Sequence, residues 1–309
     1  MELVVGTLVL NRFLIERRIG SGGFGVVYEA WDGRLERTVA VKAIESRGAQ
    51  CCKRVLREAQ AAARLNHPGI VTLYEMGEED GNALLVTELV EGRTLARLSR
   101  EGALSDREIG EIGADLCEAL DHAHSRGVVH RDIKPQNVVV APEGEFRARL
   151  MDFGIARLSD SASLTAPGDV VGTLAYMSPE QAEGQTAGPE ADVYSLALTL
   201  YECWGGENPN RRATPAATAR AIGARPRPLR RLRPDLPREI SDAIDSALQS
   251  RPGRRPALEE LGSAIEDALD RLADDLPATH APLGLRLGAV AAAAMLGAWL
   301  ALGHGAFLP

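Results

Sequence analysis

The alternation of apolar and polar positions divides the chain into a strand-rich first quarter and a helix-rich remainder. Short alternating or apolar runs, broken by Gly and Asp-Gly turns, predict strands over residues 13–19, 25–31, 38–43, 70–75 and 83–89. Apolar residues at helical spacing predict helices over 52–65, 95–100, 106–125, 190–204, 237–249 and 258–272. A hairpin pattern over 138–141 and 147–151 interrupts the helices. We therefore expect an α+β fold with a small strand-rich part, which holds one helix, and a large helical part.

Two segments of the helical part differ in the structure that their sequences predict. The helix over 106–125 follows Ser105, a favoured N-cap residue, and Glu108 stands three residues later, as in a capping box. Residues 211–238 are instead rich in Arg, Pro and Ala, and we predict a solvated surface loop with a short helix there.

The C-terminal residues form a separate apolar segment. Residues 287–303 contain no charged side chain, and these 17 residues lie near the lower limit for a membrane-spanning helix. We predict a transmembrane helix over 285–305, a juxtamembrane linker over 269–284, and an N-terminal side that faces the cytoplasm beside Arg286. The alternative is an alanine-rich helix that packs on the domain or on a partner.

Composition narrows the classes of function. The 309 residues carry 35 Lys and Arg against 43 Asp and Glu, a net charge of −8, which argues against nucleic-acid binding through bulk basic charge. The four cysteines lack the spacing of a disulfide scaffold or a metal site, so we expect thiols in a reducing compartment. The N-terminal decapeptide has no basic region and no small-residue cleavage site, so we predict no signal peptide.

Lysine is nearly absent from this chain. Only three of the 35 basic residues are lysine, namely Lys42, Lys53 and Lys134, and the other 32 are arginine. A site that needs a compact cation with three rotatable donors cannot accept a planar guanidinium. The surviving lysines are therefore candidates for chemistry.

A glycine-rich pattern, Gly-X-Gly-X-X-Gly, is formed by Gly20, Gly22 and Gly25. The same pattern opens dinucleotide-binding folds, where it leads into a helix. Here the β-branched, strand-like run 26–30 follows, so we predict a turn between two strands. Glycines at such a turn let the backbone close over phosphates, with amide hydrogens facing the anion.

Lys42 closes the apolar run 39–41 in a predicted strand. A charge within a buried strand needs a partner, and the next predicted helix offers Glu58. The alternative is a surface lysine on an edge strand, and the depletion of lysine elsewhere argues against it.

The densest chemistry lies in the octapeptide His-Arg-Asp-Ile-Lys-Pro-Gln-Asn at 130–137. It combines a candidate base, Asp132, a cation, Lys134, and a metal-binding amide, Asn137. Asp152 follows at the end of a predicted strand, before Phe-Gly. Asn137 and Asp152 supply the hard oxygen ligands that Mg²⁺ takes alongside phosphate oxygens.

These motifs occur in the order of one family. GSGGFGVVY, VAVK, HRDIKPQN, DFG, GTLAYMSPEQ and ADVYSLALTLYE follow one another over about residues 12–268. The chain resembles the eukaryotic-like protein Ser/Thr kinases, and most closely their bacterial membrane-anchored branch. The resemblance implies a two-lobed protein-kinase fold over 12–268, with a small β-rich N-lobe and a large helical C-lobe.

The resemblance also implies a role for each motif residue. Lys42 would hold the α- and β-phosphates of ATP and pair with Glu58. Asp132 would accept or orient the proton of the substrate hydroxyl, and Lys134 would neutralise charge on the transferred group. The lid over the phosphates would comprise Ile19, Gly20, Ser21, Gly22, Gly23, Phe24 and Gly25.

The remaining implied contacts are with the metal and the adenine. Asn137 and Asp152 would chelate Mg²⁺, or Mn²⁺ in its place. The adenine contacts would be Val27, Ala40 and Val139 as a sandwich, Thr87 as the gatekeeper, and the Glu88 carbonyl and Val90 amide at the adenine edge.

Substrate type and control are implied by four further positions. Lys134 and Thr173 point to Ser and Thr rather than Tyr as acceptors. Thr173 would bond both Asp132 and Lys134. Arg131 implies control by activation-loop phosphorylation, because a buried arginine pairs well with a phosphate. We predict Thr165 as the first phosphosite and Ser163 as the second.

Three residues would be structural in the large lobe. Glu180 and Arg255 would form a buried ion pair, and Asp192 would bond the backbone of the His130–Asp132 loop. Two positions depart from the family pattern: Ala197 stands in place of a glycine and Asn210 in place of an aromatic packing residue. These departures remove no catalytic group, and substrate docking is the part that they put in doubt.

The predicted function is ATP-dependent transfer of the γ-phosphoryl group to Ser and Thr hydroxyls of proteins, including the activation loop, in signal transduction. The alternatives are a pseudokinase that binds nucleotide as a scaffold and a small-molecule phosphotransferase. The expected partners are ATP, protein substrates, a second copy for trans-autophosphorylation and, through the C-terminal segment, a membrane. We expect the kinase domain on the cytoplasmic side of the inner or plasma membrane, or in the cytoplasm if that segment does not insert.

Overall fold

The computed structural model describes residues 3–22, 25–44, 49–142, 144, 146–153 and 172–274. Several sequence predictions lie outside the described residues: Gly23, Phe24, Ser163, Thr165, residues 275–284 of the linker and the span over 285–305. Residues 1–278 form one compact unit, and its described part is the subject below.

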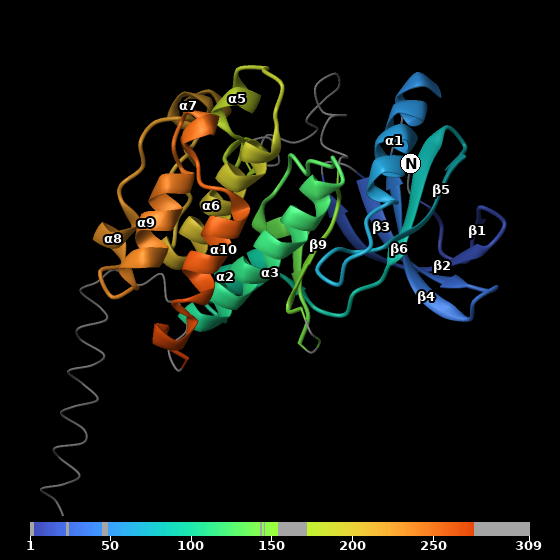
Figure 1. The fold of residues 1–309 in the computed structure, drawn as a ribbon. Coiled ribbons are helices and arrows are strands. Elements are labelled where there is room, and N and C mark those ends of the chain that lie inside the picture. Colours follow the sequence, from blue (N-terminus) through green and yellow to red (C-terminus); the bar gives the residue numbers. More distant parts are fainter. Residues whose placement is uncertain are drawn as a thin grey trace, which may run out of the picture. The chain divides into compact units, whose positions relative to one another are not determined.

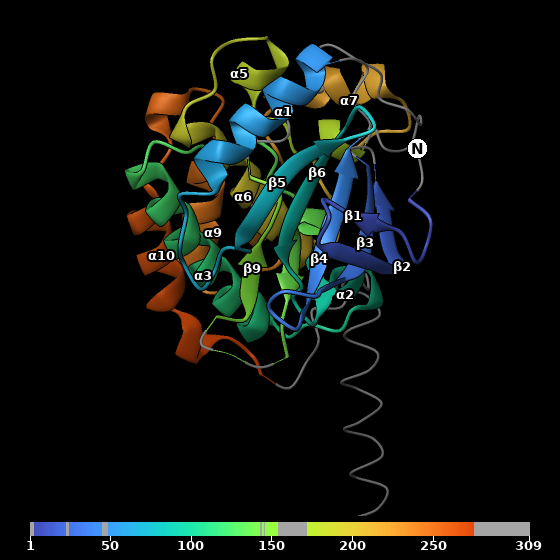
Figure 2. The ribbon, with the colours of Figure 1, turned by 90° about the vertical axis from the view of Figure 1, so that its right-hand side faces the viewer.

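The N-terminal part is built around an antiparallel sheet, in which the described strands run in the order β1-β2-β3-β4-β6-β5. Each predicted strand is present, with small shifts at its ends (Figures 1 and 2). The strands are β1 (Leu8–Val9), β2 (Phe13–Gly22), β3 (Gly25–Asp32), β4 (Arg37–Ile44), β5 (Leu73–Glu79) and β6 (Asn82–Glu88). The strand predicted from residue 70 begins at Leu73, because Ile70 forms a bridge with Leu150 of the other lobe instead.

Alternation along the strands gives this sheet two different faces. One face buries an apolar cluster that includes Phe13, Ile15, Tyr28, Val39, Val41, Leu84 and Val86. The other face packs against the helix α1 (Ala49–Ala62), as Figure 2 shows, through Ile44, Cys52, Val55, Ala59, Ala83 and Leu85. Lys42 pairs with Leu85 across the β4–β6 ladder and therefore lies on the α1 side.

Asp32, at the end of β3, is fully buried and forms an ion pair with Arg12. The guanidinium donates from Nε to Oδ1 at 2.7 Å and from Nη2 to Oδ2 at 2.6 Å. The amides of Arg34 and Leu35 also donate to Oδ1. The hydrogen bond from Arg12 is the main cause that lowers the pKa of Asp32 to about 2, against the opposing effect of burial.

We predict that this ion pair makes the N-lobe sensitive to acid. Because the pKa of Asp32 is lower in the folded than in the unfolded chain, its contribution to the free energy of unfolding is complete above about pH 4 and is lost as the pH falls towards 2. Asp32→Asn should be less stable than the wild type at neutral pH and lose less stability over that acid range, measured by urea unfolding. Asp80→Asn, on an exposed turn, is the control. If the free energy of unfolding of Asp32→Asn fell with pH as steeply as that of the wild type over this range, Asp32 would not be the group that causes the acid sensitivity.

The C-terminal part consists mainly of helices, which confirms the predicted division into two lobes (Figure 1). Its longer described helices are α2 (Leu95–Glu101), α3 (Asp106–Ser125), α6 (Pro189–Gly205), α7 (Pro215–Ala221), α9 (Arg238–Ala247) and α10 (Leu258–Glu266). The shorter turns are η1 (Pro135–Asn137), α5 (Pro179–Ala182), α8 (Leu229–Leu232), η3 (Pro252–Arg254) and η4 (Leu269–Arg271). A small sheet joins β7 (Arg93–Thr94), β8 (Val138–Val140) and β9 (Ala148–Leu150).

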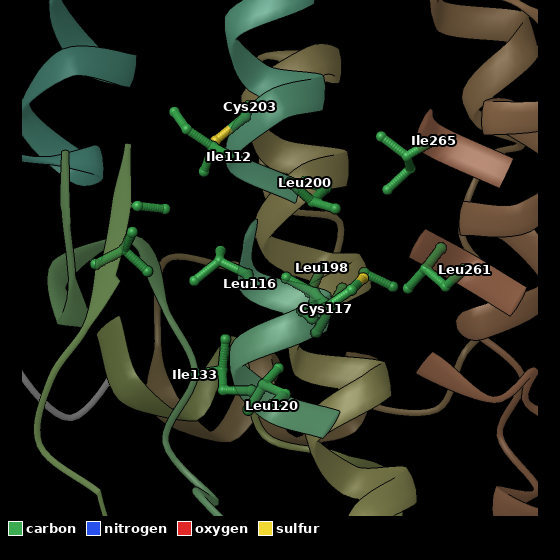
Figure 3. Close-up of a cluster of buried hydrophobic side chains, with 14 of the residues drawn as sticks. Ile112, Leu116, Cys117, Leu120, Ile133, Leu198, Leu200, Cys203, Leu261 and Ile265 are labelled. Atoms are coloured by element: carbon green, nitrogen blue, oxygen red, sulfur yellow. The ribbon is translucent and has the colours of Figure 1, made fainter. Parts of the chain in front are cut away.

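The core of the large lobe is centred on α3. Figure 3 shows its apolar side chains with those of α6 and α10; the labelled residues include Ile112, Leu116, Leu120, Leu198, Leu200, Leu261 and Ile265. A Cβ atom on Gly113 would lie 3.1 Å from Leu200 and 3.2 Å from Ile265, which is tight packing. Ile133, between the candidate base and the candidate cation, is fully buried in the same cluster. The core therefore holds the loop that carries the chemistry.

The start of α3 is the predicted capping box. Ser105 Oγ accepts from the amide of Glu108 at 3.1 Å, and the Glu108 carboxylate accepts from the amide of Ser105 at 2.8 Å. The cap satisfies two backbone donors at a helix end that is partly buried.

The segment 211–238 corrects the sequence prediction, because part of it is core rather than solvated loop. It contains two helices, α7 and α8, and Leu229 is fully buried. Arg233 is 4% exposed and donates to both carboxylate oxygens of Asp106 and to Asp235. An Arg-rich composition predicted solvent exposure, but a carboxylate distant in sequence makes burial of one arginine favourable.

No helix in the described part of the chain has the length and apolar character that a membrane span requires.

Candidate active site

The glycine-rich segment forms the tip of the β2–β3 hairpin, as predicted. Gly20 pairs with Val27, and Gly22 pairs with Gly25. Gly25 has a φ of +135°, and a Cβ atom there would lie 2.1 Å from the Ala43 carbonyl oxygen of β4. Only glycine fits this close approach of two backbones. The last glycine of the pattern, Gly25, is therefore required for a steric reason, in addition to any contact with phosphate.

The residues predicted around the nucleotide share one face of the sheet. Val27 pairs with Lys42 and Ala40 pairs with Thr87, so all four side chains lie on the α1 side. Val139 of β8 comes from the other lobe and is half-buried. Ile19 is exposed on β2, Ser21 pairs with Val26, and Val90 follows β6 in the connection between the lobes.

The ammonium group of Lys42 forms an ion pair with Asp152. The distance from Nζ to Oδ2 is 2.6 Å, which joins a strand of the small lobe to the second residue after β9 in the large lobe. Glu58 lies half-buried on α1, the helix that packs on the same face of the sheet. The pairing of Lys42 with Glu58 stays a prediction.

Asp132 is buried at the centre of a charged hydrogen-bond network. Lys134 Nζ donates to both of its carboxylate oxygens, at 2.8 and 3.0 Å. The Asn137 amide donates to the Asp132 carbonyl at 2.8 Å and to Oδ2 at 2.9 Å. Charged hydrogen bonds of this kind fix the direction of a carboxylate better than neutral ones. The octapeptide thus places its candidate base, cation and amide within hydrogen-bond distance of each other.

Asp192, fully buried on α6, holds the backbone of this loop. Its carboxylate accepts from the amides of His130 at 2.8 Å and Arg131 at 2.7 Å, and it also bonds the ring of His124 at 2.7 Å. Arg131 has a φ of +68°, which is unfavourable for a residue with a side chain. The bonds to Asp192 stabilise that conformation. Asp152, a predicted metal ligand, shows the same strain with a φ of +66°.

The segment 173–181 is attached to the catalytic loop at both ends. Thr173 Oγ1 accepts from Lys134 Nζ at 3.1 Å, which places the predicted residue next to the catalytic pair. At the other end, Gln181 Nε2 donates to the Arg131 carbonyl at 2.9 Å. Sequence reasoning assigned no role to Gln181, although it stands within the quoted SPEQ motif.

Glu180 and Arg255 form the buried ion pair that the resemblance implies. Arg255 Nη1 and Nη2 donate to the two carboxylate oxygens at 2.6 and 2.8 Å. Burial raises the pKa of Glu180, but the hydrogen bond and charge of Arg255 outweigh it and lower the pKa overall. The guanidinium also donates to three backbone carbonyls, those of Gln249, Ser250 and Glu190.

Glu88, at the predicted adenine edge, is held by a partner that sequence reasoning missed. Arg149 of β9 donates to its carboxylate at 2.6 Å, and the amide of Glu88 donates to the Thr72 carbonyl at 2.9 Å. Arg149 lies 61 residues away in the chain, so no local pattern indicates the pairing. The contact ties the connection between the lobes to the small sheet of the large lobe.

Asn137 and Asp152 fit a magnesium site that is completed by phosphate. The amide nitrogen of Asn137 is directed to Asp132, which leaves its carbonyl oxygen for a cation. A carboxylate has about four lone-pair sites, so the bond from Lys42 leaves acceptor capacity on Asp152. Among the described residues, no group of three or more His, Cys, Asp and Glu could hold a metal ion alone. Two protein oxygens with phosphate oxygens suit Mg²⁺.

The two lobes, the strand lysine, the Asp-Lys-Asn cluster and the acidic residue after β9 define the protein kinase class. The sequence profile of the Protein kinase domain family matches residues 13–264. The chain therefore belongs to the protein kinase family, which confirms the resemblance to protein kinases and the two-lobed fold.

Bacterial serine/threonine-protein kinases are among the similar proteins. PknA of Mycobacterium tuberculosis is 40% identical over 260 residues, which cover 81% of this chain and 59% of PknA. PrkC of Bacillus subtilis is 34% identical over 274 residues, which cover 87% of this chain and 42% of PrkC. The chain thus spans about half the length of these curated relatives. The crystal structure of the PknI kinase domain of M. tuberculosis matches with a TM-score of 0.70 and 28% identity, over 87% of this chain and 99% of that one.

We predict that Lys42→Met weakens ATP binding by at least about tenfold, because a charged hydrogen-bonding partner of the phosphates is removed. Calorimetric titration with Mg-ATP would measure the change. Lys53→Met is a matched control, since Lys53 is one of the three lysines and is exposed on α1. Equal affinities in the wild type and in Lys42→Met would show that Lys42 does not hold phosphate.

Proposed function

We propose that this chain is an ATP-dependent protein kinase that transfers the γ-phosphoryl group to Ser and Thr hydroxyls. The observation that carries the proposal is the Asp132 carboxylate, held by Lys134 and Asn137 within hydrogen-bond distance. The position of Thr173 on the same Lys134 supports Ser and Thr as acceptors. The relatives named above are serine/threonine-protein kinases.

In the proposed reaction, the oxygen of a substrate hydroxyl forms a bond to the γ-phosphorus while the bond to the β-γ bridging oxygen breaks, and ADP leaves. Asp132 orients the hydroxyl and receives its proton, and Lys134 stabilises the negative charge on the transferred group. Lys42 and the glycine-rich hairpin position the phosphates. Bound Mg²⁺ supplies charge neutralisation at the phosphate oxygens. Catalysis here depends on positioning and electrostatic stabilisation, which the network around Asp132 is suited to provide.

The proposal is tested by incubating the full chain with radiolabelled Mg-ATP and a Ser/Thr-rich acceptor protein, followed by phosphoamino-acid analysis. We expect phosphoserine and phosphothreonine, no phosphotyrosine, and no product after removal of the metal with EDTA. Nucleotide binding without transfer would favour the scaffold alternative. Transfer to small alcohols but not to protein would favour a small-molecule phosphotransferase.

We further propose that the kinase domain is tethered on the cytoplasmic side of a membrane by residues 285–305, and that two copies phosphorylate each other's activation loops. The uncharged run 287–303 supports the tether. Alkaline extraction of cell membranes tests it, because a spanning segment keeps the chain in the membrane pellet. Release into the supernatant would contradict the tether and leave a soluble kinase. Transfer between copies is tested separately, by mixing an inactive copy with an active one.

A further inference from the structure

Tyr176, Glu202 and Arg211 form a hydrogen-bonded triad in the large lobe. Arg211 donates from Nη1 to Glu202 Oε1 at 2.8 Å and from Nη2 to the Tyr176 hydroxyl oxygen at 2.9 Å. The Tyr176 hydroxyl donates to Glu202 Oε2. Tyr176 is buried, Glu202 comes from the end of α6, and Arg211 lies in the loop after it. Each member therefore contacts the other two.

The same loop also holds the backbone next to Tyr176. Asn210, the residue that departs from the family pattern, is 2% exposed and donates to the Ala175 carbonyl at 3.2 Å. Ser195 donates to the Tyr176 carbonyl at 2.8 Å. The polar residue at 210 is therefore a buried, bonded support for the segment 173–181, and it positions Arg211 beside Tyr176.

The triad lies within reach of a peptide whose hydroxyl is at Asp132. Thr173 contacts Lys134, which contacts Asp132. Tyr176 is three residues from Thr173, and three residues span at most about 11 Å. An extended peptide advances about 3.3 Å per residue, so substrate side chains two to four positions from the acceptor cover the same distance.

Glu202 has little capacity left to bind a basic substrate. Both of its carboxylate oxygens have protein donors, and its side chain is 14% exposed. Burial, followed by the negative charge of Glu202, raises the pKa of Tyr176, so the phenol stays a neutral donor at physiological pH. An incoming arginine would have to displace Arg211 from this carboxylate.

Positive charge remains on the exposed side of the triad. The Arg211 side chain is 41% exposed and uses two of its five N–H donors in the triad. Arg212 is also exposed, and the bonds described for its guanidinium go to the backbone carbonyls of Pro209 and Arg211. Arg211 and Arg212 thus bring two guanidinium groups to the one carboxylate of the triad.

We propose that Arg211 is a specificity-determining residue, which makes this kinase prefer protein substrates with an acidic or phosphorylated side chain close to the acceptor Ser or Thr. The inference rests on the proposed function and specifies its substrate class. Arg211 acts in two ways: it occupies the carboxylate that would attract a basic substrate, and it offers the donors that the triad does not use to an anionic one.

The test compares two sets of Ser/Thr peptides that differ only in Asp or Arg at single positions up to four residues from the acceptor. For the wild type, we expect kcat/KM to be about tenfold higher for the best acidic peptide than for the matching basic one. Arg211→Gln should reduce this ratio about tenfold, the size expected when one charged hydrogen-bonded contact is lost. The ratio does not depend on the fraction of folded enzyme.

Two further variants separate charge from structure. Arg211→Lys keeps the positive charge and should retain most of the acidic preference. Arg220→Gln, an exposed arginine on α7, should leave the ratio unchanged. If the wild type prefers basic peptides, or if Arg211→Gln phosphorylates both sets with the wild-type ratio, the inference is wrong while the kinase function stands. If the wild type phosphorylates no peptide and not itself, the proposed function fails, and the inference fails with it.

Discussion

Replacing Asp132 by asparagine is expected to lower the rate of phosphate transfer to a peptide by about 10³-fold, within the range for loss of a positioned proton acceptor. The substituted side chain has nearly the same shape, and its carbonyl oxygen can still accept from Lys134. It lacks the negative charge that orients and receives the hydroxyl proton. Affinity for Mg-ATP should change by less than about threefold, because in the proposed reaction Asp132 acts on the acceptor hydroxyl rather than on the phosphates.

The initial rate of phosphate transfer at saturating Mg-ATP and the calorimetric affinity for Mg-ATP would be measured on the same samples. The control is Asp270→Asn, where the side chain is 97% exposed and the nearest described cation is 3.9 Å away. We expect that control to keep the wild-type rate. A rate in Asp132→Asn within tenfold of the wild type would assign the proton-accepting role to another group.

Truncating Arg255 is expected to have the largest effect on stability, about 3–5 kcal/mol for Arg255→Ala, because the buried Glu180 carboxylate would lose its partner. Arg255 bonds both oxygens of Glu180 and three backbone carbonyls, so its loss leaves several acceptors unsatisfied. The midpoint and slope of urea unfolding would give the change in free energy.

Arg254→Ala is the matched control, since Arg254 is the exposed neighbour of Arg255 on η3 and should change stability by less than about 0.5 kcal/mol. The lowered pKa of Glu180 adds a pH signature: the contribution of the ion pair is complete above the ordinary pKa of glutamate and is lost as the pH falls through the lower, folded value. An Arg255→Ala variant as stable as Arg254→Ala would show that the pair is not needed for stability.

Short-range chemistry explains which parts of the site were predictable. His130 to Asn137 lie in one octapeptide, so a base, a cation and an amide had to be near each other whatever the fold. The depletion of lysine singled out Lys42 and Lys134, and the structure places each within hydrogen-bond distance of a candidate acidic residue. The strands were predictable as short apolar or alternating runs because both faces of the sheet carry apolar side chains. One face buries its own cluster, and the other packs on α1.

Pairings between distant residues were not predictable, because periodicity indicates burial without naming a partner. Arg149 with Glu88, and Arg233 with Asp106, join residues 61 and 127 positions apart. Lys42 illustrates the same limit. The sequence indicated that it needs a carboxylate and offered Glu58 of the next helix, a pairing that stays a prediction, but it gave no sign of the ion pair with Asp152, 110 residues away.

Two-residue strands and substituted motif positions were also beyond the sequence pattern. β1 and β7 are too short for alternation to be recognised. Asn210 stands where the family has an aromatic packing residue, and at the level of sequence it only put substrate docking in doubt. In the structure its amide instead finds a backbone acceptor, and the adjacent Arg211 completes the triad with Tyr176 and Glu202.

The most direct test of the central claim is mass spectrometry of the full chain after incubation with Mg-ATP, with Asp132→Asn treated in parallel. The account predicts phosphate on Ser and Thr residues of the wild type, with Thr165 and then Ser163 as the first sites, and no added phosphate on the variant. Binding of Mg-ATP by a wild-type chain that acquires no phosphate and transfers none to protein would contradict the assignment as an active kinase.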